Sequence, residues 1–321
     1  MSKPLLSVSG LGISTVQDPR TLVNSVSFEI MPGEAVGVVG ESGSGKTLTA
    51  LSILGLLPRG VAVAGGSIVF NDIDLTKASP EIMRNLRGSD ISMVYQDPMT
   101  ALNPVMKLGR QLLEVIESHE KLDNSSIARV EAALREVGIP QVERAMESYP
   151  HEFSGGMRQR VMIAMALLLS PKLLIADEPT TALDVTIQQQ ILALVSEQRR
   201  KRDMSMLWIT HDLGVVANLV DRLIVMYAGN IVEAGTVQEI FTNPQHPYTH
   251  GLLSSLPSRT DKSRKRLTSI PGVPQKPWLV GNTCAFAPRC FKATSECTAS
   301  APKLVGTLEK SVACFHPMGG K

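Results

Sequence analysis

The segment GESGSGKT at residues 40–47 follows the apolar run AVGVV at residues 35–39. A short continuous apolar run is typical of a buried strand in a parallel sheet. Glycines in the segment let backbone N–H groups turn inward, so the loop and the start of the next helix form an anion site. The spacing Gly-x₄-Gly-Lys-Thr therefore predicts a P-loop between a strand and a helix, in an α/β fold that binds a nucleotide.

We expect different groups of this loop to bind the phosphates and the Mg²⁺ ion. Lys46 adds a positive charge for the β- and γ-phosphates, and the Thr47 hydroxyl is suited to coordinate Mg²⁺. The remaining contacts to the phosphates are expected from Gly40, Ser42, Gly43, Ser44 and Gly45.

A second buried strand is predicted to end at two carboxylates. The stretch LLIADE at residues 173–178 places Asp177 and Glu178 directly after an apolar run. In open α/β sheets the carboxyl ends of the strands face the ligand crevice. We therefore expect Asp177 to bind Mg²⁺ and Glu178 to polarise the attacking water as a general base.

Two further polar residues follow apolar runs. Gln96 comes after ISMVY at residues 91–95, where its amide can bind Mg²⁺ and the water. His211 comes after MLWIT at residues 206–210, and we expect it to contact the γ-phosphate. Alone, either residue would be read as structural, so both assignments depend on the neighbouring motifs.

The segment SGGMRQ at residues 154–159 has no use in its own chain's nucleotide site. It makes sense as a second glycine-rich phosphate contact, made by Ser154, Gly155 and Gly156 and offered to another subunit. The dipole of a helix that begins just after Ser154 would add to the attraction for phosphate.

In this order, the motifs resemble those of the nucleotide-binding subunits of ATP-binding-cassette (ABC) transporters, with Asp184 matching the D-loop. The resemblance implies a RecA-like P-loop NTPase cassette of α/β class, with an antiparallel β subdomain and a helical subdomain. It also implies a head-to-tail pair of ATPase subunits that share their two nucleotides. No aromatic residue precedes Phe28, although this family often stacks adenine on an aromatic side chain there.

Further segments resemble the oligopeptide, dipeptide and nickel importer branch, namely residues 100–104 (TALNP), 149–168, 243–253 and 270–272. That branch implies ATP-driven peptide import, with a second, related ATPase in a heterodimer, two transmembrane permease subunits and an external or periplasmic substrate-binding protein. Import of nickel or another small solute is the alternative within the branch. A soluble ABC ATPase without a transport role is the alternative outside it.

All the cysteines follow residue 283: Cys284, Cys290, Cys297 and Cys314 are separated by five, six and sixteen residues. Four thiolates can bind Zn²⁺ or an iron–sulfur cluster. The short Cys-x₂₋₄-Cys pairs usual for structural zinc (about two to four residues apart) do not occur. The peptide importers that the chain resembles are thought to carry a [4Fe–4S] cluster, which we expect here, with zinc or free thiols as alternatives.

The composition limits the partners of the chain. Its 32 basic and 30 acidic residues give a net charge of +2, so we expect no nucleic-acid partner. The longest apolar run, at residues 161–169, is far shorter than the roughly 18 residues of a membrane span. We therefore expect no membrane span in this chain, and the resemblance to transporter subunits implies a peripheral protein on the cytoplasmic face of the cell (inner) membrane.

The pattern of runs and breaks divides the chain. Residues 1–240 are predicted to form the ABC ATPase domain, with a helical subdomain inserted at about 97–170. Within it, short alternating runs at residues 5–30 predict antiparallel strands, and residues 46–57 predict a helix. Residues 241–321, where prolines become frequent, are predicted to be an extended C-terminal appendage with the four-cysteine metal motif.

Overall fold

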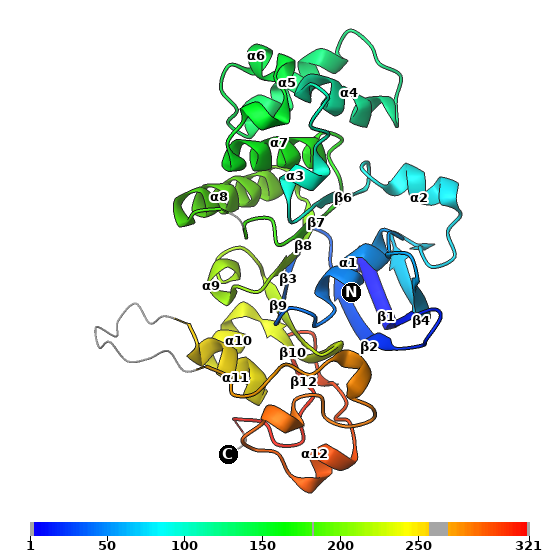
Figure 1. Ribbon diagram of the computed structural model, residues 1–321, viewed down its shortest axis with the longest axis vertical. Coiled ribbons are helices and arrows are strands. Elements are labelled where there is room, and N and C mark those ends of the chain that lie inside the picture. The colour runs from blue at the N-terminus through cyan, green and yellow to red at the C-terminus, as the bar shows by residue number, and fades with distance from the viewer. Residues whose placement is uncertain (1–2, 182, 257–268, 320–321) are drawn as a thin grey trace, which may run out of the picture. The chain divides into compact units, whose positions relative to one another are not determined.

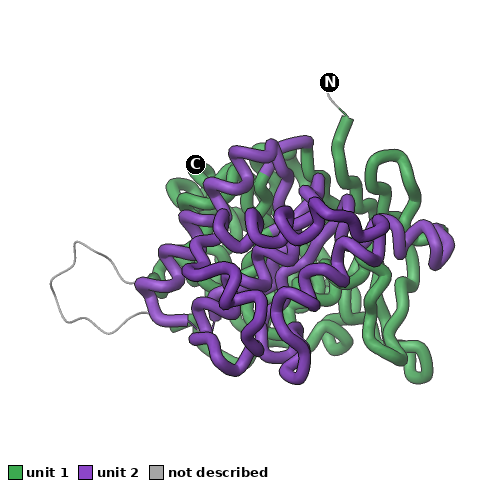
Figure 2. The backbone as a smooth tube through the Cα atoms, turned by 90° about the horizontal axis from the view of Figure 1, so that it is seen from above, with its two compact units in different colours: residues 1–31, 35–77, 208–321 green, residues 32–34, 78–207 purple. Residues whose placement is uncertain are grey.

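The computed structural model describes residues 3–181, 183–256 and 269–319 (Figure 1). It contains two compact units (Figure 2): unit 1 comprises residues 1–31, 35–77 and 208–321, and unit 2 comprises residues 32–34 and 78–207. This division differs from the boundaries predicted at residues 240, 97 and 170, which stay predictions. Each unit is described by itself below.

Unit 1 contains an antiparallel sheet in the order β2-β1-β4-β5. Its strands are β1 (Leu6–Thr15), β2 (Thr21–Ile30), β4 (Val61–Phe70) and β5 (Ile73–Asp74). Val8 pairs with Phe28 on one side and with Ile68 on the other, and all three side chains are buried. Apolar residues alternate along β1 because one face of this sheet is buried, so the predicted antiparallel strands are confirmed.

A second set of strands in unit 1 follows the order β11-β12-β10-β9-β3-β8. It comprises β3 (Ala35–Val39), β9 (Arg222–Tyr227), β10 (Asn230–Thr236), β11 (Val305–Gly306), β12 (Lys310–Val312) and, from Trp208 onward, β8 (Ser205–Thr210). β3 pairs with β9 in parallel, and both are buried along their whole length. The continuous apolar run before the P-loop is therefore a buried parallel strand, as predicted.

The C-terminal segment is not simply an extended appendage. β12 pairs antiparallel with β10, with Glu233 opposite Val312. The chain returns to the sheet because the outer edge of β10 would otherwise leave its backbone groups unpaired. Helices of unit 1 are α1 (Lys46–Ile53), α9 (Leu213–Val216), α10 (Val237–Thr242), α11 (Pro247–Ser254) and α12 (Ser295–Ala299), so α1 is shorter than predicted.

Unit 2 is mostly helical and contains the parallel pair β6 (Ile91–Val94) and β7 (Leu173–Asp177). Its helices are α2 (Pro80–Leu86), α3 (Pro98–Ala101), α4 (Leu108–Glu117), α5 (Ser126–Glu136), α6 (Val142–Glu147), α7 (Gly155–Leu167) and α8 (Val185–Arg202). α7 carries the long apolar run and buries Val161, Ile163 and Leu167. In the described parts of the chain, we find no helix with the length and apolar character of a membrane span.

Candidate functional site

The P-loop connects β3 to α1 and has a backbone that only glycine accommodates at two positions. Gly40 has φ +154°, and a Cβ there would lie 2.2 Å from the carbonyl oxygen of Met226. Gly45 has φ +99°, and its Cβ would lie 2.9 Å from Val23 Cγ2. The loop therefore depends on these glycines for its left-handed turns and its close packing on neighbouring strands.

Two polar side chains of the loop face inward. Lys46 is 5% exposed, and its Nζ donates hydrogen bonds to the carbonyl oxygens of Gly40 (2.8 Å) and Glu41 (3.0 Å). Ser44 Oγ is buried without a hydrogen-bond partner. A buried hydroxyl without a partner is costly, so an incoming phosphate oxygen that accepts its hydrogen bond would relieve that cost. Thr47, Ser42 and Gly43 are exposed, as a ligand-contacting loop requires.

The two expected acidic residues lie at the end of β7 in unit 2. Asp177 is the last residue of the strand and is 5% exposed. Glu178 follows with φ +46°, in the left-handed region. Its Oε2 accepts hydrogen bonds from Thr181 Oγ1 (3.0 Å) and from Gln96 Nε2 (3.4 Å). The structure thus brings together the predicted general base and the predicted glutamine, which are far apart in sequence.

Thr181 is a contact that the sequence analysis missed. Its N–H donates to the Glu178 carbonyl oxygen (3.3 Å) in a turn, which returns the threonine hydroxyl to the Glu178 carboxylate. The available signal was a hydroxyl three residues after an acidic residue, a spacing typical of local turns. Thr181 and Gln96 together restrict the orientation of the carboxylate.

The signature residues lie at the N-terminal end of α7 in unit 2. Ser154 is the N-cap, and its Oγ accepts from the Met157 N–H (3.4 Å). A Cβ on Gly156 would lie 2.7 Å from Ile187 Cγ2 in α8, whereas one on Gly155 would be 3.8 Å from its nearest neighbour, Leu183 Cδ2. Gly156 is therefore also required for helix packing within the chain.

The remaining predicted residues lie in separate places. Asp184 is the N-cap of α8 and accepts from the Ile187 N–H (3.0 Å). His211 is exposed directly after β8. The P-loop and His211 belong to unit 1, whereas Gln96 and the acidic pair belong to unit 2.

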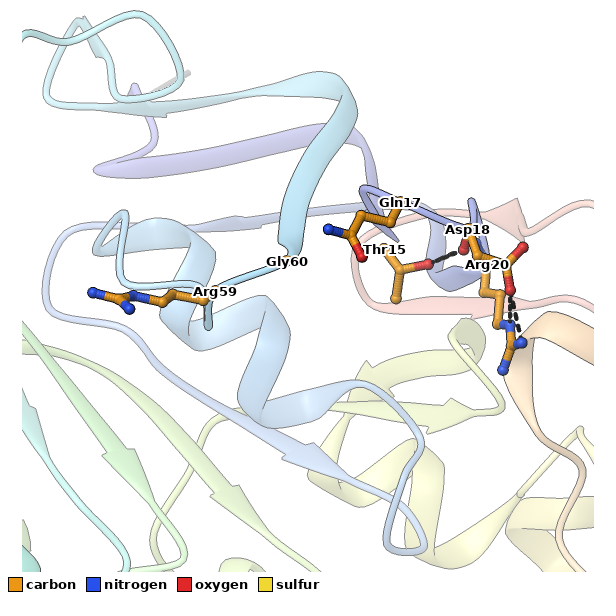
Figure 3. Close-up of a pocket in the computed structure, with 6 residues that line it drawn as sticks. All are labelled: Thr15, Gln17, Asp18, Arg20, Arg59 and Gly60. Carbon is orange, nitrogen blue, oxygen red and sulfur yellow. Dashed lines mark hydrogen bonds and ion pairs between the residues drawn. The ribbon is translucent and has the colours of Figure 1, made fainter.

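A pocket of about 570 Å³ opens in unit 1 where the missing aromatic residue would be expected (Figure 3). It is lined by Thr15, Gln17, Asp18, Arg20, Arg59 and Gly60. Arg20 is paired with Asp18 at 2.7 Å, and Arg59 comes from the segment after α1 (Figure 3). Guanidinium planes can stack on aromatic rings. Arg20 and Arg59 are the side chains of this pocket that could stack on a base in this way.

The four cysteines are free thiols in the C-terminal part of unit 1. Burial raises the pKa of Cys284 and Cys290, and raises that of Cys314 to about 11. The three other thiols also raise the pKa of Cys314, which indicates that the sulfur atoms share one neighbourhood. Within residues 3–181, 183–256 and 269–319, however, no three His, Cys, Asp or Glu side chains form a group that could hold a metal ion. The expected ligand set is therefore not formed in this structure.

Two family models match the chain. Residues 23–181 match the model described as ABC transporter, and residues 232–297 match the one described as oligopeptide/dipeptide transporter, C-terminal region. The first match contains the P-loop, Gln96, the signature residues and the acidic pair, and the second contains residues 243–253 and 270–272.

Curated proteins with similar sequences come from several bacteria. The oligopeptide transport ATP-binding protein of Bacillus subtilis is 52% identical over 84% of this chain and 76% of its own length. The dipeptide transport ATP-binding protein of the same organism is 51% identical over 89% of this chain and 86% of its own. The oligopeptide transport ATP-binding protein of Escherichia coli is 44% identical over 98% of this chain and 94% of its own.

Solved structures with a similar fold are ATPase cassettes. A protein from Clostridium perfringens that is part of an ABC transporter complex has a TM-score of 0.66 and 28% identity, over 75% of this chain and 92% of that one. A dimeric ATP-binding cassette bound to ADP and Pi has a TM-score of 0.64 and 23% identity, over 72% of this chain and 98% of that one. The likeness confirms the predicted α/β cassette fold.

Proposed function

The chain belongs to the ATP-binding subunits of ABC transporters for oligopeptides and dipeptides, and on this premise we propose that it hydrolyses ATP to power peptide import across the cytoplasmic membrane. The observation that carries the proposal is the agreement of both family models with relatives of about 50% identity over most of the chain. Import of nickel or another small solute, and a role outside transport, remain the alternatives.

The nucleotide would be held by the P-loop. Lys46, the buried hydroxyl of Ser44 and the loop's backbone N–H groups would bind its phosphates. Thr47, Gln96 and Asp177 have the oxygen ligands that Mg²⁺ prefers, and the ion would neutralise phosphate charge.

Hydrolysis would depend on Glu178 as the general base. Its carboxylate, oriented by Thr181 and Gln96, would accept a proton from the attacking water, and His211 would contact the γ-phosphate. All these residues would contact the same nucleotide, and together they would form one half of its binding site.

The other half would come from a second, related ATPase subunit. Ser154, Gly155 and Gly156 begin a helix whose exposed N-terminus suits a phosphate, and Asp184 begins the next helix. We propose that these residues serve the partner's nucleotide in a heterodimer. Because each site would then need both subunits, the isolated chain would hydrolyse ATP slowly.

The subunit would act at the cytoplasmic face of the membrane, as a peripheral partner of two permease subunits that receive peptides from a substrate-binding protein. Residues 97–110, which follow Gln96, would dock on a permease. Met99 and Val105 are exposed apolar side chains in this segment, as expected of a contact surface.

The test is a reconstituted complex in lipid vesicles. With the partner ATPase, both permeases and the substrate-binding protein present, added peptide should stimulate ATP hydrolysis and enter the vesicles. Stimulation by a nickel chelate and not by peptides would favour the alternative solute. A rate of ATP hydrolysis that is the same with and without the permeases would favour a role outside transport.

We also propose that the cysteine segment binds a [4Fe–4S] cluster, with zinc as the alternative. The support is the resemblance of this segment to peptide importers and the electrostatic influence of the thiols on one another. The cysteine side chains would have to rearrange to bind a cluster. Anaerobically purified protein should then contain iron and sulfide and absorb broadly in the visible range. Zinc in place of iron, or neither metal, would contradict the cluster.

A further inference from the structure

A buried arginine of the C-terminal segment contacts the P-loop. Arg289 is next to Cys290 in sequence, and its side chain is 4% exposed. Its Nη1 donates to Glu41 Oε2 at 2.8 Å, and its Nε donates to the carbonyl oxygen of Pro271 at 2.8 Å. Because Glu41 directly follows Gly40, this ion pair joins the start of the phosphate loop to a segment more than two hundred residues away.

Glu41 is bound through three of its groups. Its carboxylate accepts from Arg289, and its backbone N–H donates to Tyr248 Oη at 2.9 Å. Its carbonyl oxygen accepts from Lys46 Nζ at 3.0 Å. Both Arg289 and Tyr248 belong to the chain beyond residue 241, so residues far outside the loop restrain its first turn.

Aromatic rings lie beside the arginine of the ion pair. The ring centroids of Tyr227, Tyr248 and Phe286 lie between 4.7 and 5.4 Å apart. The Arg289 guanidinium lies 5.8 Å from the Tyr227 ring and 5.9 Å from the Phe286 ring. The Glu41 side chain is 25% exposed, and salt and water screen a partly buried pair less than an exposed one. Removing the arginine would therefore leave the Glu41 carboxylate as a partly buried charge that no cation compensates.

An unpaired carboxylate at this place would oppose nucleotide binding. The backbone of the loop forms a nest for anions, and ATP brings several negative charges to it. A negative side chain one residue into the loop repels those charges unless a cation neutralises it.

We propose that Arg289 is a positioning residue for ATP binding, which neutralises Glu41 and restrains the P-loop, so that the C-terminal segment is a working part of the nucleotide site. The inference rests on the proposed function, because it takes the P-loop as the ATP site.

The test is calorimetric titration of full-length chains with MgATP, all carrying Glu178→Gln so that ATP persists. Arg289→Met should raise the Kd about tenfold, within the usual range of coupling between sites. Adding Glu41→Gln to Arg289→Met should recover most of the affinity, because the repelling charge is gone. If Arg289 acts only through its hydrogen bonds to the carbonyl oxygens of Pro271 and Ile270, no such recovery is expected, because Glu41→Gln restores neither bond.

A second ion pair of the C-terminal segment is the matched control. Lys310 Nζ lies 2.9 Å from Glu239 Oε2, away from the P-loop contacts, so Lys310→Met should leave the Kd unchanged. An unchanged Kd in Arg289→Met, or a double variant no better than the single one, would overturn the inference. A reference chain that binds no ATP would overturn the proposed function, and the inference with it.

Hydrogen exchange tests the same coupling in the unsubstituted chain, so its result does not depend on whether a variant folds correctly. The N–H groups of Ala287 and Arg289 donate to the carbonyl oxygens of Cys284 (3.0 Å) and Phe286 (2.9 Å). Because coupling is reciprocal, saturating ADP should slow exchange of these amides about fivefold or more. Exchange that does not change with bound ADP would contradict the coupling.

Discussion

The buried imidazole of His246 makes the stability of unit 1 depend on pH. The residue is 1% exposed, its Nδ1 accepts from the Tyr248 N–H (3.1 Å), and its ring centroid lies 5.7 Å from that of Phe286. Burial lowers the pKa of His246 from 6.5 to about 3. Between these values the unfolded chain binds the proton and the folded chain does not. The contribution to stability is therefore complete above the unfolded pKa and is lost as the pH falls below it.

The size of the effect follows from the two pKa values. A change from about pH 7.5 to about pH 5.5 protonates most of the unfolded imidazole and little of the folded one, which removes about 1.4 kcal/mol of unfolding free energy. A neighbouring group, Glu233, changes the unfolding free energy with pH in the opposite direction. Glu233 accepts the N–H groups of Gln245 (2.6 Å) and His246 (2.9 Å), and burial raises its pKa, so acid favours its folded form.

The assay is urea unfolding at both pH values, followed by the fluorescence of the buried Trp208. His246→Asn replaces the ring-nitrogen acceptor at the N-cap of α11 with an amide oxygen, which can accept the same N–H but does not titrate. The smaller side chain should cost stability equally at both pH values. The unsubstituted chain should therefore lose about 1.4 kcal/mol more than the variant on acidification. Equal losses in the two proteins would refute a buried, uncharged His246.

Two further substitutions test the phosphate loop and the signature helix. Lys46→Ala removes the buried ammonium and should weaken ATP binding about tenfold to a hundredfold, the equivalent of one charged hydrogen bond; calorimetry would check this, and wild-type affinity would exclude a phosphate contact. Gly156→Ala places a Cβ 2.7 Å from Ile187 Cγ2 and should cost about 1–3 kcal/mol of stability. Gly155→Ala, whose Cβ would be 3.8 Å from its neighbour, is the control and should cost much less; equal losses in urea unfolding would contradict the packing argument.

The sequence predicted the elements that carry strong local signals. The apolar run before Gly40 became β3, and the alternating runs near the N-terminus became β1 and β2. The serine before the signature glycines became the N-cap of α7. Each of these depends on a pattern that neighbouring residues already contain, namely a buried strand, a half-buried strand or a cap.

The start of α5 shows a limit of prediction from sequence. Ser125 occupies the N-cap position of α5, but its side chain makes no capping hydrogen bond. Asp123 instead accepts from the Ser125 N–H at 2.9 Å. A run of Asp, Asn and Ser offers several competing oxygen acceptors, so sequence alone does not decide which one binds.

Contacts between distant segments could not be predicted. Nothing near Glu41 indicates that Arg289 is its partner. The motifs predict that Gln96 and Glu178 lie near the same water, but not the direct hydrogen bond between them. Such pairs depend on the tertiary fold, which brings together residues that have no periodic relation in the chain. The four clustered cysteines and the resemblance to peptide importers predicted a metal ligand set, which the described residues do not form in this structure.

The central claim is that this chain hydrolyses ATP with Glu178 as the general base. The most direct measurement is single-turnover hydrolysis of MgATP by the assembled transporter, with and without Glu178→Gln. The amide keeps the size of the side chain and its contact partners, Gln96 and Thr181, but cannot accept the proton. We expect unchanged ATP binding and a rate at least about a hundredfold lower. Hydrolysis by Glu178→Gln at the normal rate would contradict the account.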